Sequence, residues 1–209
     1  MLAALESSVR ANMPGVALVT ERIEPPAEIN PVESNHRKFL AWAAFVERTP
    51  GRVVLLDADV IVNGDLAEAF GEWDAGITER TDAPMPLNGG VVFLNDTEGA
   101  REFMRRWLKW ELEYYNNREE YREWYRRFCG PNQTALGLLL ERDTEGLRIE
   151  RLPCRIWNAC EDDYQHAGES KAIHYKGRAR RFAYNFVETR KIPDELKVVV
   201  EVWRKYAPR

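Results

Sequence analysis

The spacing of apolar residues along the chain changes repeatedly between a helical period and short apolar runs. Apolar residues at i, i+3 and i+4 predict amphipathic helices, and short apolar runs between turn residues predict buried strands. The predicted helices are 2–12, 34–48, 65–70, 97–128 with a break at Asn116–Asn117, 131–140 and 193–206. The predicted strands are 16–20, 52–56, 75–78, 90–94, 147–152 and 172–174. This alternation predicts an α/β sandwich with a mainly parallel central sheet.

The N-terminal part of the chain contains two less regular segments. Val16–Thr20 (VALVT) is short, apolar and rich in Val, so it predicts a buried strand. Residues 23–34 are rich in Pro and Glu and predict a loop. Ser34 or Asn35 is then expected to cap the following helix.

The first chemical motif is Asp57-Ala58-Asp59, which directly follows the predicted strand RVVLL. Ligands of α/β sheets bind beyond the carboxyl ends of the strands, where Asp57 is placed. Two neighbouring carboxylates repel each other unless a positive group joins them, and hard divalent cations prefer carboxylate oxygen. The alternative is that one Asp caps the turn and the other is merely exposed. The preceding buried strand favours a metal site.

Two further motifs carry amides and glycines. Asn88-Gly89-Gly90 precedes the apolar run VVFL, and its glycines let the backbone approach a ligand while Asn88 offers a donor and an acceptor to a sugar hydroxyl. Asn132 and Gln133 stand at a predicted helix start. The alternatives are a tight turn for the first motif and simple helix capping for the second.

The fourth motif, His174-Tyr175-Lys176-Gly177, ends a predicted late strand. His174 can offer an imidazole nitrogen to a metal, Lys176 can neutralise phosphate, and Gly177 can let the backbone approach it. The arginines that follow, among them Arg180, either reach a diphosphate or line a solvated loop. A lone histidine is more often structural, and that alternative stays open here.

Together the four motifs resemble the GT-A glycosyltransferases, most closely the group of glycogenin and the lipopolysaccharide galactosyltransferases. The resemblance covers residues 1 to about 185 and implies a Rossmann-like α/β/α sandwich that moves a sugar from a nucleoside-diphosphate sugar to an acceptor. It implies a Mn2+ or Mg2+ ion bound by Asp57, Asp59 and His174, with the imidazole favouring manganese. The remaining implied roles are nucleotide-sugar binding by Lys38, Asp57, Ala58, Lys176 and Gly177, sugar or acceptor binding by Asn88, Gly89 and Gly90, and catalytic positions at Asn132 and Gln133.

The chain departs from this family pattern in two places. Asn132 stands where the family usually has Asp, and an amide cannot act as a base or a nucleophile, which leaves it an orienting role. The family fold usually opens with a strand that binds the nucleotide base, whereas this chain starts at the following helix. We therefore expect the fold either to lack this strand or to receive it from upstream residues, another segment or a partner chain.

Composition narrows the class of protein. A formal net charge of −4 argues against nucleic-acid binding, which usually needs a basic face. Three irregularly spaced cysteines and the absence of an apolar run of membrane-spanning length predict a cytoplasmic protein without a transmembrane segment. The length predicts a single domain spanning residues 1–209. The acceptor (a glycan, a lipid or a protein) and the oligomeric state, with a homo-oligomer as one option, stay open.

Two rival functions remain. A phosphatase of the haloacid-dehalogenase type also carries Asp57 and Asp59 after an apolar strand, and Glu161-Asp162-Asp163 would then be its late acidic motif. A non-catalytic sugar- or nucleotide-binding module is the second rival function, and Asn132 motivates it.

The aromatic residues at helical spacing could form a carbohydrate platform, but packing is the more common role for Trp107, Tyr114, Trp110 and Trp124.

Overall fold

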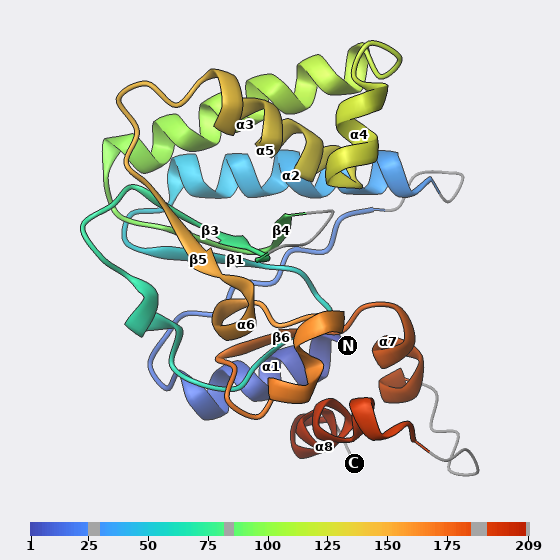
Figure 1. Cartoon of the computed structure of the whole chain (residues 1–209). Helices are drawn as coiled ribbons and strands as arrows, with labels where there is room; N and C mark the ends of the chain where they lie inside the picture. The colour runs from blue at the N-terminus through green and yellow to red at the C-terminus, as the bar shows by residue number, and fades with distance from the viewer. Residues whose placement is uncertain (25–29, 82–85, 185–191, 208–209) are drawn as a thin grey trace. The chain divides into compact units, whose positions relative to one another are not determined.

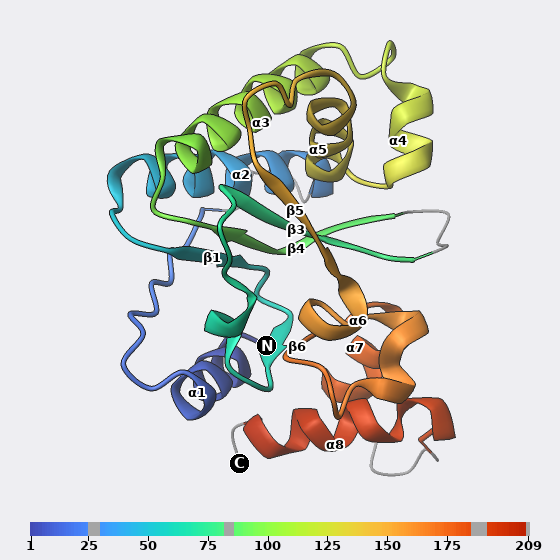
Figure 2. The ribbon, with the colours of Figure 1, turned by 60° about the vertical axis from the view of Figure 1, so that its left-hand side comes forward.

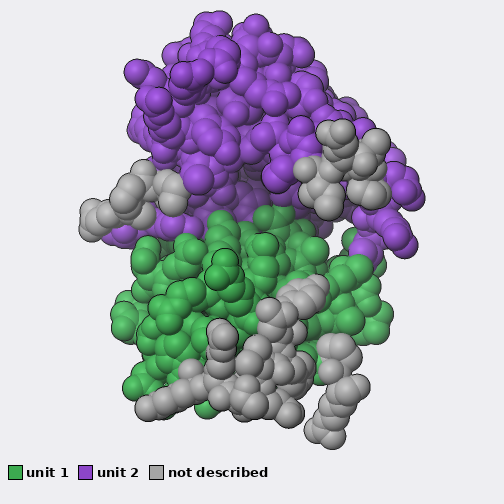
Figure 3. All heavy atoms as spheres, turned by 90° about the vertical axis from the view of Figure 1, so that its right-hand side faces the viewer, with its two compact units in different colours: residues 1–19, 56–70, 152–209 green, residues 20–55, 71–151 purple. Residues whose placement is uncertain are grey.

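The computed structural model describes residues 1–24, 30–81, 86–184 and 192–207. The chain divides into two compact units, which Figure 3 shows in different colours. Unit 1 comprises Met1–Val19, Leu56–Phe70 and Leu152–Arg209, and unit 2 comprises Thr20–Leu55 and Gly71–Arg151. The predicted α/β class is confirmed, and the central sheet is mixed. A single domain over residues 1–209 stays a prediction.

Unit 2 is built around a four-stranded sheet. In spatial order the strands are β1 (Val53–Leu56), β4 (Leu87–Leu94), β3 (Ala75–Glu79) and β5 (Ile149–Pro153). β3 and β4 are antiparallel, with Ala75 opposite Leu94 and Ile77 opposite Val92. This pairing departs from the expected mainly parallel arrangement, because β3 and β4 follow each other in sequence and antiparallel neighbours need only a short connection.

Three helices cover one face of this sheet (Figure 1). They are α2 (Pro31–Arg48), α3 (Glu98–Asn116) and α5 (Pro131–Arg142), and α4 (Arg122–Phe128) precedes α5. Their apolar stripes meet the sheet in a core that includes Phe39, Phe103 and Trp107, each fully buried. The predicted break between α3 and α4 near Asn116–Asn117 is confirmed.

Unit 1 contains a two-stranded antiparallel sheet of β2 (Val60–Val62) and β6 (Ala172–His174). Its helices are α1 (Leu2–Asn12), α6 (Cys154–Trp157), α7 (Gly177–Tyr184) and α8 (Lys197–Tyr206), with short 3-10 helices at Leu66–Ala69, Glu161–His166 and Asp194–Leu196. Helices α1 and α8 lie side by side (Figure 2). The core joins Ile61 and Ile173 of the strands to Tyr175, Val199 and Trp203.

Helix α1 covers the edge of β2 that faces away from β6. The backbone N–H of Val62 donates to Oγ of Ser8 at 3.0 Å, and the Val62 carbonyl accepts from Nδ2 of Asn12 at 2.9 Å. These side chains therefore satisfy backbone groups that a neighbouring strand would otherwise pair. In the described part of the chain β1 likewise forms one edge of the four-stranded sheet. An additional strand beside β1 stays a prediction.

Several predicted elements differ from the structure. The predicted strand 16–20 is wrong: the segment has no regular secondary structure, and Val16 and Val19 are 52% and 61% exposed. Apolar β-branched residues favour a strand only where a partner pairs their backbone. The predicted loop 23–34 ends early, because Asn30 caps α2 and Pro31 occupies its first turn, where proline is favoured. Residues 25–29 of that loop lie outside the described residues.

The remaining differences concern short or polar elements. β4 begins at Leu87 rather than residue 90, and the last helix starts as a 3-10 turn before α8. Strand β2 and helices α6 and α7 were not expected, since two of them span only three or four residues and α7 (GRARRFAY) is short and contains three arginines. No described helix is long and apolar enough to cross a membrane.

A polar pair is buried between α2 and α3. Nδ1 of His36 lies 3.3 Å from Oε1 of Glu111, whose side chain is fully buried. Burial raises the pKa of Glu111 to about 7, although the charge of Lys38 acts in the opposite direction. Burial also lowers the pKa of His36. The pair is therefore held in its less charged states, as expected for ionisable groups taken out of water.

This pair makes stability depend on pH. Since the folded pKa of Glu111 lies above its unfolded value of 4.5, the folded state holds a proton that the unfolded state releases. The stability that this bound proton contributes is fully present below pH 4.5 and is lost as the pH rises through 7. We expect the free energy of unfolding of Glu111→Gln not to show this loss. Between pH 5 and pH 8 the variant should therefore become more stable relative to the unaltered chain by on the order of 2–3 kcal/mol.

Urea unfolding of both proteins from pH 5 to 8 measures this difference. The matched control is Glu119→Gln, which removes a highly exposed carboxylate and should retain the pH dependence of the unaltered chain. Parallel pH profiles for Glu111→Gln and the unaltered chain would show that Glu111 is ionised at neutral pH in the folded state.

Candidate metal centre

A four-residue turn presents the two aspartates of the first motif. Asp57 directly follows β1, and Val60 opens β2. The backbone N–H of Val60 donates to the Asp57 carbonyl at 3.1 Å, which closes a turn with Ala58 and Asp59 at its centre. Ala58 is exposed, whereas both aspartates are partly buried. The turn thus explains why the two carboxylates stand one residue apart at the end of an apolar strand.

The pairing of β2 with β6 brings His174 to this turn. Val60 lies opposite His174 in the antiparallel register, and the N–H of Tyr175 donates to the Asp59 carbonyl at 2.9 Å. A histidine 115 positions further along the chain is therefore fixed beside Asp59 by main-chain hydrogen bonds. The predicted convergence of Asp57, Asp59 and His174 is confirmed.

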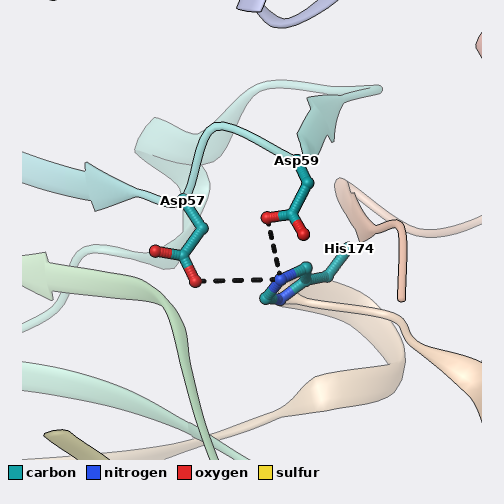
Figure 4. A group of neighbouring side chains, drawn as sticks. All are labelled: Asp57, Asp59 and His174. Atoms are coloured by element: carbon teal, nitrogen blue, oxygen red, sulfur yellow. Dashed lines mark ion pairs between the residues drawn. The ribbon is translucent and has the colours of Figure 1, made fainter. Parts of the chain in front are cut away.

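The three side chains point toward one another (Figure 4). Nε2 of His174 lies 3.1 Å from Oδ1 of Asp59 and 3.8 Å from Oδ2 of Asp57. The His174 side chain is almost fully buried, while Asp57 and Asp59 retain part of their exposure. The centre is therefore rigid on its histidine side and open to solvent on its carboxylate side.

Asp59 is ionised despite its burial. Burial by itself raises the pKa of this carboxyl, but the hydrogen bond and charge of His174 and the charge of Arg180 together lower the pKa to about 2. Arg180 of α7 contacts Oδ2 of Asp59 and donates through Nε to the Tyr175 carbonyl at 3.0 Å. The contacts with His174 and Arg180 thus stabilise the Asp59 charge in this arrangement.

The donor set fits a divalent cation. One ligand atom of each residue lies within 4.8 Å of the other two. Ligands about 2.1 Å from an octahedral ion are about 3–4 Å apart, so small side-chain movements would close the set. Two carboxylates and one imidazole suit manganese or magnesium by their oxygen content, and the imidazole suits manganese better. These three residues could hold such an ion, whose identity stays a prediction.

The loop after His174 holds the predicted phosphate-binding residues. The N–H of Lys176 donates to Oη of Tyr164 at 2.9 Å. Gly177 has φ of +48°, and a Cβ at this position would lie 3.1 Å from Oε1 of Glu161. The left-handed backbone and the close Glu161 side chain both favour glycine here. Binding of a nucleotide-sugar by Lys176 and Gly177 stays a prediction.

The second and third motifs meet within unit 2. A Cβ on Gly89 would lie 3.7 Å from Cγ of Gln133. The Asn88 carbonyl accepts a hydrogen bond from Thr78 at 2.6 Å, and its side chain accepts one from the Gly90 N–H at 3.4 Å. Asn88 is nearly fully buried and lies with both glycines inside β4, so the alternative of a tight turn before the strand is wrong. Sugar or acceptor binding by Asn88, Gly89 and Gly90 stays a prediction.

The two candidate catalytic amides differ in their contacts. Nε2 of Gln133 donates to the Phe128 carbonyl at the end of α4. Asn132 is buried, its carbonyl accepts from the indole of Trp107 at 2.9 Å, and its Oδ1 has no hydrogen-bond partner among the described residues. Lys38 lies 4.5 Å from the ring centre of Trp42. The assigned roles of Asn132, Gln133 and Lys38 stay predictions.

The aromatic residues of the helices have the packing role that was the more common expectation. Trp107 and Tyr114 are buried in the core. The guanidinium of Arg142 lies 4.9 Å from the ring centre of Trp124 and 5.9 Å from that of Trp110. The arginine therefore packs near one face of each of these two indoles, in agreement with a packing role.

Two residues of the site were assigned no firm role from sequence. Arg180 was expected either at a diphosphate or in a solvated loop, and the structure places it on Asp59. In the sequence, only the position of Arg180 in a run of basic residues indicated a role for it. Tyr164 was missed, because nothing in the local sequence distinguishes it from a core tyrosine. Its hydroxyl lies between the backbone groups of His174 and Lys176.

No protein-family model matches the sequence, and no curated protein matches it either. Among solved structures, the chain is similar to a glycosyltransferase involved in the glycosylation of the major capsid of PBCV-1, with a TM-score of 0.63 and 18% identity over 86% of this chain and 88% of that chain. It is also similar to the glycosyltransferase GlyE of Streptococcus pneumoniae TIGR4, with a TM-score of 0.51 and 22% identity. That match covers 81% of this chain and 42% of GlyE.

The fold is that of glycosyltransferases. The finer grouping with glycogenin and the lipopolysaccharide galactosyltransferases stays a prediction. The phosphatase alternative expects its late acidic motif at the end of an apolar strand, but Glu161-Asp162-Asp163 lie in a 3-10 helix. The acidic triplet therefore lacks the placement that the phosphatase alternative expects.

Asp59 is the residue on which metal binding should depend most. Asp59→Asn keeps the side-chain size but removes the charge, and we expect the Kd for Mn2+ to rise at least about tenfold, since even outer-shell changes at metal sites have effects of this size. Electron paramagnetic resonance of free Mn2+ during a titration measures the Kd. Asp162→Asn removes an exposed carboxylate of the same unit and should bind as the unaltered chain does. Equal Kd values for Asp59→Asn and the unaltered chain would exclude Asp59 as a ligand.

Proposed function

We propose that this chain is a metal-dependent glycosyltransferase that uses a nucleoside-diphosphate sugar as donor. The observation that carries the proposal is the convergence of Asp57, Asp59 and His174 in a chain with a glycosyltransferase fold. A carboxylate pair at the end of a strand, joined by a buried imidazole, is suited to a divalent cation. A sugar diphosphate in turn needs positive charge where its leaving group departs.

The charged groups of unit 1 have complementary roles in this proposal. Asp57, Asp59 and His174 hold the divalent ion, Mn2+ in preference to Mg2+. When bound, the ion supplies Lewis-acid stabilisation of the negative charge that develops on the diphosphate. Arg180 and Lys176 orient the diphosphate through their positive charges.

Further roles are proposed for backbone groups and amides within each unit. Ala58, at the centre of the Asp57–Val60 turn, and Gly177, with its left-handed backbone, allow main-chain atoms to approach the donor. Lys38 contributes a further positive charge. Asn88, Gly89 and Gly90 contact the sugar or the acceptor, and Asn132 and Gln133 orient the reacting groups without exchanging a proton. The acceptor is a glycan, a lipid or a protein.

Turnover of a donor tests the proposal directly. We expect the chain to release nucleoside diphosphate from at least one common nucleotide-sugar in the presence of Mn2+, by transfer to added acceptor or by slow hydrolysis. Chelation of the metal or Asp59→Asn should abolish the release, because both remove the charge that stabilises the leaving group. Coupled detection of the released diphosphate over a panel of donors measures it.

Two outcomes would redirect the assignment. Tight binding of a nucleotide-sugar without turnover would favour the binding-module alternative, which Asn132 motivates. Release of phosphate from an aryl phosphate without turnover of any nucleotide-sugar would favour the phosphatase alternative.

Arg180 should have opposite effects on metal and nucleotide. Its guanidinium contacts one oxygen of Asp59, so it competes with a cation for that carboxylate until a diphosphate offers another anionic partner. We expect Arg180→Gln to leave Mn2+ affinity equal or a few-fold tighter without nucleotide. The Kd of the nucleoside diphosphate with Mn2+ should rise about tenfold, the scale of one hydrogen bond to a charged group.

Isothermal titration of each ligand measures both effects. The matched control is Arg178→Gln on the same helix, whose guanidinium lies 3.3 Å from Glu195 instead of at the metal centre. Weaker Mn2+ binding by Arg180→Gln, with unchanged nucleotide binding, would show that Arg180 merely supports the fold around Asp59.

A further inference from the structure

The two ring nitrogens of His174 have different surroundings. Nε2 faces the two aspartates, whereas Nδ1 is buried and has no hydrogen-bond partner among the described residues. Metal-binding histidines are usually oriented by a hydrogen bond from the ring nitrogen that does not bind the metal. His174 lacks this restraint in the described part of the chain, so its ring must be oriented by packing and by its own backbone.

The backbone of His174 is held on both sides. Its N–H donates to the Ala159 carbonyl at 2.8 Å. Its carbonyl accepts a hydrogen bond from the hydroxyl of Tyr164 at 2.7 Å. The same hydroxyl accepts from the N–H of Lys176 at 2.9 Å. One phenol oxygen therefore joins the two peptide groups that flank Tyr175 and fixes the direction in which the chain leaves His174.

Tyr164 is itself well anchored. It lies in the 3-10 helix Glu161–His166, is 3% exposed and packs in the same core cluster as Ile173 and Tyr175. A phenol hydroxyl has one proton to donate and lone pairs to accept with, which matches its two contacts here. The hydroxyl can therefore act as donor and acceptor at once throughout the neutral range.

We infer that Tyr164 is a positioning residue for the metal centre: its hydroxyl sets the backbone of His174, and with it the imidazole, while holding Lys176 at the start of the following loop. This inference rests on the proposed function, because it requires His174 to bind a metal. It adds a residue that contacts neither metal nor donor but links the imidazole to the segment that carries Lys176 and Gly177.

The test compares Tyr164→Phe with a matched control in Mn2+ binding. Tyr164→Phe keeps the ring in the core and removes only the hydroxyl, so we expect the Kd for Mn2+ to rise about tenfold, the lower end of the effect of outer-shell changes. The control is Tyr206→Phe, which removes a hydroxyl that accepts from Asn12 at 2.8 Å in the same core cluster. Both variants should lose some thermal stability, but Tyr206→Phe should bind Mn2+ as the unaltered chain does.

The outcomes separate this inference from the proposed function. Failure of the unaltered chain to bind Mn2+ overturns the metal centre and this inference with it. Normal binding by both the unaltered chain and Tyr164→Phe overturns the role of Tyr164 and leaves the metal centre intact. Equal weakening in Tyr164→Phe and Tyr206→Phe also overturns it, because a general loss of stability would then explain both.

A second variant covers the case in which Tyr164→Phe does not fold. Replacement of Tyr164 by 4-aminophenylalanine keeps a donor for the His174 carbonyl but offers a poorer acceptor to the Lys176 N–H. We expect an intermediate Kd for Mn2+, above that of the unaltered chain. A Kd equal to that of the unaltered chain would contradict a positioning role that depends on both hydrogen bonds.

Discussion

The antiparallel register of β2 and β6 is the constraint on which the candidate site depends. It places His174 opposite Val60, so the imidazole meets the carboxylate of the residue just before Val60. A pairing shifted by one residue would turn the histidine to the other face of the sheet. Only three residues of each strand pair, and such a short ladder needs support. Helix α1 provides it, because Ser8 and Asn12 bind the backbone of Val62 on the opposite edge.

Local sequence predicted the parts of the site that lie on strong, regular elements. Val53–Leu56 (VVLL) is an unbroken apolar run, so the position of Asp57 at its end followed directly, and the order of the four motifs predicted that His174 would join it. Arg180 and Tyr164 were not predicted because their roles arise from contacts with Asp59 and with the His174 backbone that local periodicity does not encode. The failure at Val16–Thr20 has the same origin: β-propensity describes a residue that has a partner strand, and this segment has none in regular structure.

Each unit has buried polar groups with specific partners and, among the described residues, buried polar atoms without a hydrogen bond, such as Nδ1 of His174 in unit 1. In unit 1, both backbone groups of Val62 and both peptide groups around Tyr175 have specific partners. In unit 2, Oε2 of Glu111 and Oδ1 of Asn132 are buried without a hydrogen bond from the described residues. Unpaired buried acceptors reduce stability, and proteins retain them mainly at sites with another role or with bound water. This cost is consistent with the orienting role proposed for Asn132.

Asp59 and Glu111 show why a carboxylate beside a histidine is not enough to make a metal site. The two carboxylates have similar histidine contacts, at 3.1 and 3.3 Å. Burial dominates at Glu111 and raises its pKa to about 7, so at neutral pH a large share of it is protonated and cannot bind a cation. At Asp59 the same tendency is outweighed by the imidazole together with Arg180, and the pKa falls to about 2. A divalent ion needs ligands that are already ionised, so the partial solvent access of Asp59, rather than the histidine contact, distinguishes the candidate metal centre from the buried pair.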